Sequence, residues 1–393
     1  MTATIEDSRA RLVSRIAELR PALADKAGWT EEKGRLHEET LELLADAGVF
    51  RMRVPRRYGG LECDTRTLVD VGTELGRASG SIGWTASVYW IPTWMVGLFP
   101  DQVQEEVFST PDVRICGTLS PSAMAAPVPG GVVVNGKWGF TTGALHSHWQ
   151  EILAVQVSPD AEPMPIMAVV PSSELTVIND WDTSALRGTG SVTTVAQDLF
   201  VPAERVVPLP VILQGQSMSA HAAESMIHGA PLLPVASASS VGTALGLAIA
   251  ARDLFIGRLP ERKITYTDYI SQAEAPLTHH QVAHASMKID EAVFHAERLA
   301  DLVDTKTATH EQWSLEERIT ARADMGAAVR LAKEAVDLLA TASGGSSVYS
   351  SHPMRGIQQD VQAISLHALM NPDTNAELYG RVLCGQAPNS LYI

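Results

Sequence analysis

The stretch Gly130-Gly-Val-Val-Val-Asn-Gly-Lys-Trp-Gly-Phe-Thr-Thr-Gly143 decides the fold class of this chain. Its glycine pair predicts a hairpin turn, and the three valines that follow predict a strand. Further short runs of β-branched and apolar residues lie at 151–157, 166–170, 175–178 and 191–195. Strands of this length and spacing predict a β-sandwich or barrel between about 114 and 205.

Helical patterns lie on both sides of this β segment. Before it, apolar residues recur every three or four positions at 8–20, 30–47 and 67–78, and Pro or Gly ends each of the first two runs. After it, long helices are expected near 234–258, 277–302, 314–342 and 354–370. The order is helical, then β, then helical, without βαβ alternation, which argues against a Rossmann fold. We predict an α+β protein with an N-terminal helical domain (1–113), a central β domain (114–220) and a C-terminal helical bundle (221–393).

Composition restricts the possible partners. The 393 residues are 45% hydrophobic and carry a net charge of −15, which disfavours binding to nucleic acid or to an anionic membrane. The N-terminus has no apolar leader, and the apolar run at 235–251 is rich in Ala, Ser and Gly, so it is interpreted as a buried bundle helix. Three widely spaced cysteines fit a reducing compartment. We therefore expect a cytoplasmic protein.

Several familiar motifs fail on inspection. Gly188-Thr-Gly190 lacks a third glycine and precedes a strand, so it is not a dinucleotide fingerprint. His280, His284 and His295 share a helix face, but no HExxH or CxxC motif supplies the further ligands that zinc needs. We interpret these histidines as exposed polar helix positions and predict no metal.

Longer segments resemble the acyl-CoA dehydrogenase superfamily. Leu44–Phe50 with Val54–Gly60 resembles its N-terminal signature, Gly136–Gly143 its flavin-facing strand, and Trp181–Ser191 the end of its β domain. Gly344 to Asp360 is similar to the start of its last bundle helix. The resemblance runs collinearly over nearly the whole chain. It implies a central β-barrel or sandwich, a C-terminal four-helix bundle, a flavin between these two domains, and a homotetramer or homodimer.

The catalytic base of a dehydrogenase is missing from this sequence. Removing an α-proton from an acyl-CoA requires a carboxylate near the flavin. At one of the two places where the family carries it, Ala368 falls about where Glu would be, next to His367. At the other, the segment 234–246 contains no acid.

The remaining pattern resembles the reduced-flavin monooxygenase branch, the two-component group D enzymes similar to indole and phenol hydroxylases. Thr118–Ser122, Pro127–Gly131 and Gly136–Trp149 carry this resemblance, with Thr142 where Ser is more usual. It implies that reduced flavin from a separate reductase reacts with O2 to give a C4a-hydroperoxyflavin, which hydroxylates a small aromatic substrate. FAD is expected in preference to FMN.

The resemblance also assigns roles to residues. His367, Thr142 and His146 are the candidate catalytic residues, since a histidine titrates near neutrality and a hydroxyl can hold the flavin N5 proton. The aromatic residues expected to wall an apolar substrate cavity are Trp84, Tyr89, Trp90 and Trp94. The expected cofactor-binding residues are Thr118, Ser120, Trp138, Thr141, Thr142, Arg258, Gln281, Gly344 and Gly345. Arg258 and Gln281 would act from an adjoining subunit.

Three alternatives remain open at this point. The first is an N-oxygenase of an amino sugar, the second an acyl-CoA dehydrogenase with a displaced base, and the third a flavin-binding protein without catalysis. Each candidate residue also has a structural interpretation: His367 as a satisfied helix histidine, the aromatics as core, and Gly344-Gly345 as a helix stop.

Overall fold

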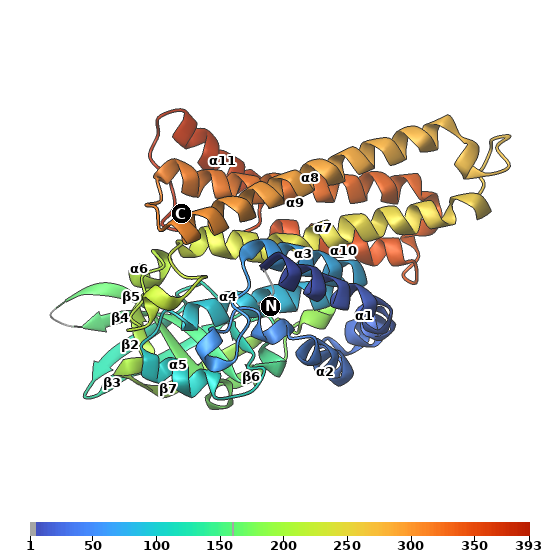
Figure 1. Cartoon of the computed structure of the whole chain (residues 1–393). Helices are drawn as coiled ribbons and strands as arrows, with labels where there is room; N and C mark the ends of the chain where they lie inside the picture. The colour runs from blue at the N-terminus through green and yellow to red at the C-terminus, as the bar shows by residue number, and fades with distance from the viewer. Residues whose placement is uncertain (1–4, 159–160) are drawn as a thin grey trace.

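The computed structural model describes residues 5–158 and 161–393 and divides into helical, sheet and helical layers (Figure 1). The N-terminal part contains α1 (Ile5–Lys33), α2 (Glu38–Asp46), α3 (Thr65–Ala78), α4 (Gly80–Val96) and α5 (Asp101–Phe108). The expectation that the first helix stops at a proline is wrong, because α1 continues through Pro21. Ile16 and Leu23 on either side of it are fully buried, and this packing outweighs the one backbone hydrogen bond that proline removes.

Helix α4 is the centre of the molecule. Ser79 caps its N-terminus by accepting a hydrogen bond from the Ile82 N–H, and nearly all of its residues are buried. A helix that is apolar all round must have protein on every side. Accordingly α4 packs against α3, against β1 of the sheet, and against α7 and α10 of the C-terminal part. Side chains on α4 therefore reach all three parts of the fold.

The β domain is a single sheet in the strand order β6-β7-β3-β2-β4-β5-β8, with β1 paired in parallel to β4. The glycine pair forms the predicted hairpin, in which Val128 pairs with Gly131 and Gly130 has a φ of +84°. One face of the sheet buries a core built from the sheet's own strands and one adjoining turn, as in a barrel. The strands are β1 (Ile115–Gly117), β2 (Ala123–Val128), β3 (Gly131–Trp138), β4 (Trp149–Ser158), β5 (Ala161–Pro171), β6 (Thr176–Ile178), β7 (Thr193–Pro202) and β8 (Val206–Pro208).

The C-terminal part is the predicted bundle. Its helices are α7 (Leu232–Arg258), α8 (Pro276–Thr309), α9 (Leu315–Ala342), α10 (Pro353–Leu366) and α11 (Pro372–Leu383), and the short α6 (Leu209–Leu213) precedes them. By length and composition α7 is apolar enough to cross a membrane, but 94% of its most apolar window is buried inside the protein, as expected for a bundle core helix. Figure 1 shows α7, α8 and α9 extending together beyond the sheet and the N-terminal helices.

The last predicted helix, expected near 354–370, ends earlier than expected, and a further helix follows it. Helix α10 ends at Leu366, and α11 starts at Pro372. The Asn371 side chain accepts hydrogen bonds from the N–H groups of Asp373 and Thr374, and this cap starts the second helix. Because α10 ends at Leu366, His367 caps the end of the helix and does not lie inside it as expected.

Candidate functional site

His367 lies at the junction of α10 and α4. It follows the last residue of α10, and its ring meets the Trp84 ring edge-on, with centroids 5.1 Å apart and planes at 69°. The Leu369 N–H donates to the His367 Nδ1 at 3.3 Å. Since Nδ1 accepts, Nε2 carries the proton in the neutral ring.

His367 is exposed as a residue, but the groups packed around its ring desolvate the imidazole and lower the pKa of His367 to about 4. The imidazole is therefore neutral at pH 7, because burial disfavours its charged form. A neutral imidazole with a protonated Nε2 donates a hydrogen bond instead of delivering a charge. This donor beside an aromatic ring is the central feature of the candidate site.

Neither of the two places where the family carries its base has a carboxylate in the described part of the chain. The α10 terminus continues His367-Ala368, and the only acidic residue on α7 is Asp253, near the far end of that helix. Within the α7 segment 234–246, Ser237 is fully buried and its hydroxyl has no partner among the described residues. A carboxylate base for proton abstraction is therefore absent from both of these locations.

A row of hydroxyls follows the predicted flavin strand. Thr142 Oγ1 lies 2.8 Å from Ser191 Oγ, which lies 2.7 Å from Thr189 Oγ1. Thr189 in turn donates to the Leu186 carbonyl at 2.8 Å. Thr141 is fully buried and donates to the Trp138 carbonyl, so Thr142 is the threonine that carries the exchangeable network.

Asp360 on α10 ties this row to the bundle. Its Oδ1 accepts a hydrogen bond from the Leu186 N–H at 2.7 Å. Burial, with a smaller contribution from the charge of Glu31, raises the pKa of Asp360 to about 7. A Cβ on Gly80 at the start of α4 would lie 2.4 Å from Asp360 Oδ2, so only glycine fits there. The sheet-side loop, α4 and α10 are thus held together at one carboxyl group.

His146 has different surroundings from His367. Its carbonyl accepts a hydrogen bond from Arg114 Nε at 2.6 Å, and its Nε2 is buried without a partner among the described residues. Burial first and the charge of Arg35 second lower its pKa to about 4. Across residues 5–158 and 161–393, no hydrogen bond or ring contact joins His146 to His367. The structure thus does not bring the two candidate histidines together, and a catalytic role for His146 stays a prediction.

The other predicted aromatic residues form core contacts. The Tyr89 hydroxyl donates to the Gly143 carbonyl, Trp90 Nε1 to Val49, and Trp94 Nε1 to Ile227. Trp138 donates to the Leu153 carbonyl inside the sheet's own core. All four are at most 1% exposed. Among the described residues, Trp84 is the predicted substrate-cavity aromatic whose ring contacts another candidate residue, His367, and a ligand contact for the others stays a prediction.

The predicted cofactor residues fall in two regions. Thr118 and Ser120 lie in the accessible loop between β1 and β2, where the Ser120 N–H donates to the Thr118 hydroxyl at 3.5 Å. Arg258 lies at the far end of α7, and Gly344 and Gly345 lie in an exposed turn after α9, where a Cβ would meet no neighbouring atom. Gln281 is partly buried near the start of α8.

The region around Arg258 is basic. Arg258 contacts His352, and Arg262 donates to the Ser346 hydroxyl at 2.7 Å. Burial first, and then the charges of Arg258 and Arg262, lower the pKa of His352. Among the described residues, neither arginine has an acidic partner within ion-pair distance. Two arginines without a carboxylate fit a phosphate or pyrophosphate group.

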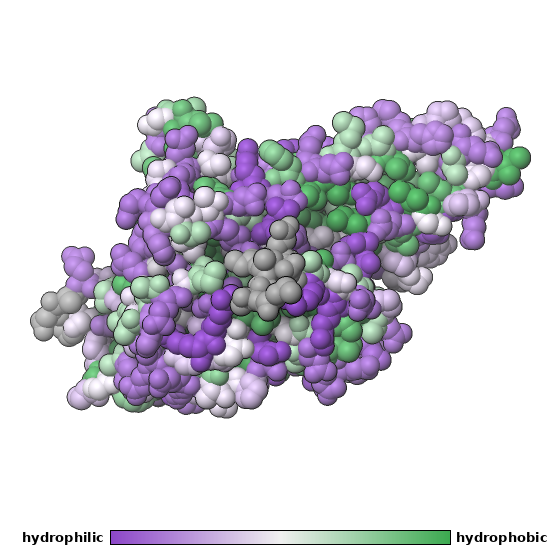
Figure 2. Space-filling view, viewed as in Figure 1, coloured by the Kyte–Doolittle hydropathy of each residue, from purple (hydrophilic) through white to green (hydrophobic). Residues whose placement is uncertain are grey.

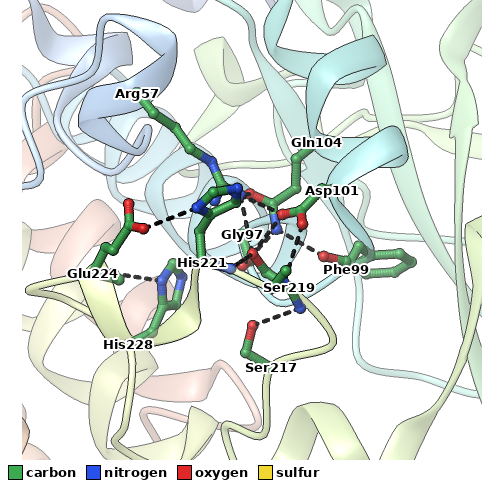
Figure 3. A network of polar contacts seen from close by, with 12 residues as sticks. Arg57, Gly97, Phe99, Asp101, Gln104, Ser217, Ser219, His221, Glu224 and His228 are labelled. Carbon is green, nitrogen blue, oxygen red and sulfur yellow. Dashed lines mark hydrogen bonds and ion pairs between the residues drawn. The ribbon is translucent and has the colours of Figure 1, made fainter.

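A second polar network serves the fold. Arg57 donates to Asp101, Gln104 and Ser219, and this network holds the segment 214–231 against α5 (Figure 3). His228 contacts the Trp94 carbonyl and the Ser225 hydroxyl within the same segment. Since the polar groups find partners inside the protein, the network is structural.

Some histidine interpretations need refinement. His280 and His284 are exposed as expected, and their Nε2 atoms are 3.0 Å apart. His295 is not simply exposed, because it is partly buried and contacts Asp324 Oδ1 at 2.8 Å. The correction follows from packing between α8 and α9, which a single-helix pattern does not contain.

Three further polar residues of interest were not predicted. Ser191 and Thr189 complete the hydroxyl row, and Glu151 is a buried acid on β4. Glu151 stands at the start of an otherwise apolar strand, and a charged residue in such a strand was the sequence feature that could have indicated a buried acid.

Two family models match the chain. The acyl-CoA dehydrogenase N-terminal domain covers residues 12–109, and the acyl-CoA dehydrogenase C-terminal domain covers residues 238–372. Together they cover more than half of the sequence, and the chain belongs to the acyl-CoA dehydrogenase family. The predicted family and fold are confirmed.

Full-length relatives specify the branch. The oxygenase component of an FADH(2)-dependent resorcinol hydroxylase from Rhizobium sp. (strain MTP-10005) is 29% identical over 97% of this chain and 96% of its own length. The oxygenase subunit HsaA, a flavin-dependent monooxygenase of Mycobacterium tuberculosis, is 27% identical over 100% of both chains. The structure of XiaF from Streptomyces sp., in complex with FADH2 and glycerol, aligns with a TM-score of 0.93 at 28% identity, covering 99% of this chain and 98% of that one. These relatives confirm the resemblance to the flavin-dependent oxygenase branch.

Proposed function

We propose that this chain is the oxygenase component of a two-component flavin-dependent monooxygenase that hydroxylates a small aromatic substrate. A separate reductase would supply the reduced flavin, and both proteins would work in the cytoplasm. The named activities of the full-length relatives support the reaction class. The negative net charge and the three unpaired cysteines are consistent with this setting.

One observation carries the proposal. At the end of α10, where a dehydrogenase of the family would need a carboxylate, the chain places a neutral His367 edge-on to Trp84. A neutral donor next to an aromatic wall suits a phenol or a ring N–H in an apolar environment. It does not suit the removal of an α-proton, which requires a base.

The residues present fit a flavin. The β1–β2 loop with Thr118 and the hydroxyl of Thr142 offer polar contacts for the ring system, and Arg258 with Arg262 offers cationic contacts for phosphates. When bound in reduced form, the flavin supplies with O2 the oxygen atom that is transferred. A pair of arginines matches the pyrophosphate of FAD better than the single phosphate of FMN.

The two groups of flavin residues point to an oligomer. The arginines lie at the end of the projecting α7–α8 hairpin, which extends away from the sheet in Figure 1. Exposed apolar side chains, including Leu277, Met287 and Phe294, lie along α8, and Figure 2 shows hydrophobic surface on this projecting part. Such surface marks an interaction site. We propose that the hairpin docks on a second copy and completes that copy's flavin site.

Within the site, each residue of the chain has a separate task. His367 Nε2 donates a hydrogen bond to an oxygen atom of the substrate or to the oxygen that is transferred. Trp84 forms an apolar wall on one side of this donor. Thr142 and Ser191 share one hydrogen bond and hold a polar ligand atom without a charge.

The proposal is tested by mixing the protein with chemically reduced FAD and then with O2 in a stopped-flow instrument. A long-lived flavin species that differs from oxidised flavin, formed only when the protein is present, supports a monooxygenase. Flavin that purifies tightly bound and is bleached by an acyl-CoA would show a dehydrogenase instead.

A further inference from the structure

Glu151 on β4 is an unusual residue for its position. It is 1% exposed, and neither carboxyl oxygen has a hydrogen-bond partner among the described residues. The adjacent Gln150 is equally buried, but its side-chain amide donates to the Thr194 hydroxyl at 2.8 Å. Buried polar groups are normally satisfied, and an unsatisfied one costs free energy. The fold therefore keeps at Glu151 an acid that it does not use for its own stability.

The pairing of β4 decides which way Glu151 faces. Glu151 pairs with Val169 on β5 and with Gly117 on β1, and directly paired residues point to the same face of a sheet. Val169 belongs to the core that the sheet shares with the helices, and Trp84 belongs to the same core. Glu151 therefore faces the helical side of the sheet, where α4 packs on β1, and not the interior of the barrel.

Gly117 gives the carboxyl group its space. A Cβ at Gly117 would lie 3.0 Å from the Glu151 Cβ and 3.5 Å from Oε2. The carboxyl group thus stands over the bare backbone of β1, one residue before Thr118 and the β1–β2 loop. Two residues further, Leu119 packs against the same core, and its carbonyl accepts a hydrogen bond from the Tyr392 hydroxyl at 2.8 Å. Since α4 packs on both β1 and α10, this point lies on the same side of the sheet as Trp84 and His367.

We propose that the Glu151 carboxyl is a substrate-recognition group, which hydrogen-bonds a hydroxyl or ring N–H of a neutral aromatic substrate. The inference rests on the proposed function and narrows its substrate class. Burial raises the pKa of Glu151 well above its ordinary value, and no nearby cation opposes this. The protonated acid offers one donor and one acceptor, which a phenol or an azole satisfies without bringing a charge into the core. Glu151 would hold the polar atom of the substrate, while His367 acts at the other side of the ring.

The test is a thermodynamic cycle in which the side chain at position 151 and one polar group of the ligand are removed separately and together. The protein, saturated with oxidised FAD, is titrated by calorimetry with two matched probe pairs, resorcinol against phenol and indole against indene. In each pair the second compound lacks one polar group. Wild type should prefer the first compound about tenfold in at least one pair, which is the discrimination expected from one buried hydrogen bond.

Two variants complete the cycle. Glu151→Gln keeps a donor and an acceptor and should keep at least a third of this preference. Glu151→Leu removes both and should reduce the preference to less than twofold, with an unchanged melting temperature or a higher one. The inference is overturned if Glu151→Leu discriminates as wild type does, if wild type shows no preference in either pair, or if Glu151→Leu changes only the affinity for FAD. The last result would show that the flavin is the partner.

Failure of this inference is distinct from failure of the proposed function. If wild type with reduced FAD and O2 forms product while Glu151→Leu keeps full discrimination, the enzyme class stands and the role of Glu151 falls. If wild type forms no long-lived flavin species and no product from any of the four probes, the proposed function itself fails.

Discussion

Replacing Asp360 by Asn tests how the site is held together. Asp360 Oδ1 accepts the Leu186 N–H at 2.7 Å, and an Asn side-chain oxygen can accept the same bond. The carboxyl group has its pKa raised from 3.8 to about 7, chiefly by burial. Since the folded state binds the proton more tightly than the unfolded state, the free energy of unfolding falls as pH rises from about 3.8 to about 7. Above about pH 7 the full loss of folding stability is present, and below about pH 3.8 the carboxyl group causes no such loss.

The magnitude follows from the shift. A rise from 3.8 to about 7 corresponds to about 4 kcal/mol of lost stability at pH 8. Asn does not titrate, so Asp360→Asn should unfold at a higher temperature than wild type at pH 8, by on the order of 5 °C. Near pH 4 the two proteins should unfold at nearly the same temperature.

The assay is thermal unfolding by circular dichroism between pH 4 and pH 8, with Asp182→Asn as the matched control. Asp182 lies in the same loop region, and its side chain is 97% exposed, so its replacement should leave the melting temperature unchanged at every pH. A lower melting temperature for Asp360→Asn at pH 8, or a difference that does not depend on pH, would refute the reasoning.

Three further predictions address the site. The pKa of His367 is about 4, so the rate of single-turnover hydroxylation should not change with a histidine-like titration between pH 6 and 8. The variant His367→Ala should lower that rate at least tenfold at every pH. A pH midpoint near 6.5 in wild type that disappears in the variant would contradict the neutral donor. Thr142→Val leaves Ser191 with Thr189 as its partner, so stability should fall by only about 1 kcal/mol while product per reduced flavin falls, measured by chromatography against peroxide released. Gly117→Ala would place a Cβ 3.1 Å from the Glu151 carbonyl oxygen. The free energy of unfolding, measured by urea titration, should therefore fall by about 1–3 kcal/mol. An unchanged urea midpoint would show that β1 and β4 can move apart without cost.

Much of the fold was predictable from local patterns. The hairpin at Gly130 follows from turn chemistry, and the long bundle helices follow from their apolar periodicity. The path of α1 through Pro21 was not predictable, because the burial of Leu23 depends on other helices.

The site was also predictable only in part, because contacts between distant parts of the chain are not visible in local sequence patterns. The missing acid and the position of His367 are visible in the sequence, because both concern residue type at one place in the chain. The contact of His367 with Trp84 and the bond of Thr142 to Ser191 join residues far apart in sequence. Only the packed structure brings such pairs together. Glu151 shows the limit most clearly, since an acid in a strand has functional meaning only when its burial and lack of a partner are known.

The central claim is that this chain transfers oxygen from O2 to an aromatic substrate with reduced flavin. The most direct measurement is a single turnover with chemically reduced FAD, isotopically heavy O2 and resorcinol or indole, followed by mass spectrometry of the product. The account predicts one heavy oxygen atom in a hydroxylated product and a much lower yield with His367→Ala. Release of all the oxygen as hydrogen peroxide with every aromatic probe, together with reduction of bound flavin by an acyl-CoA, would contradict it.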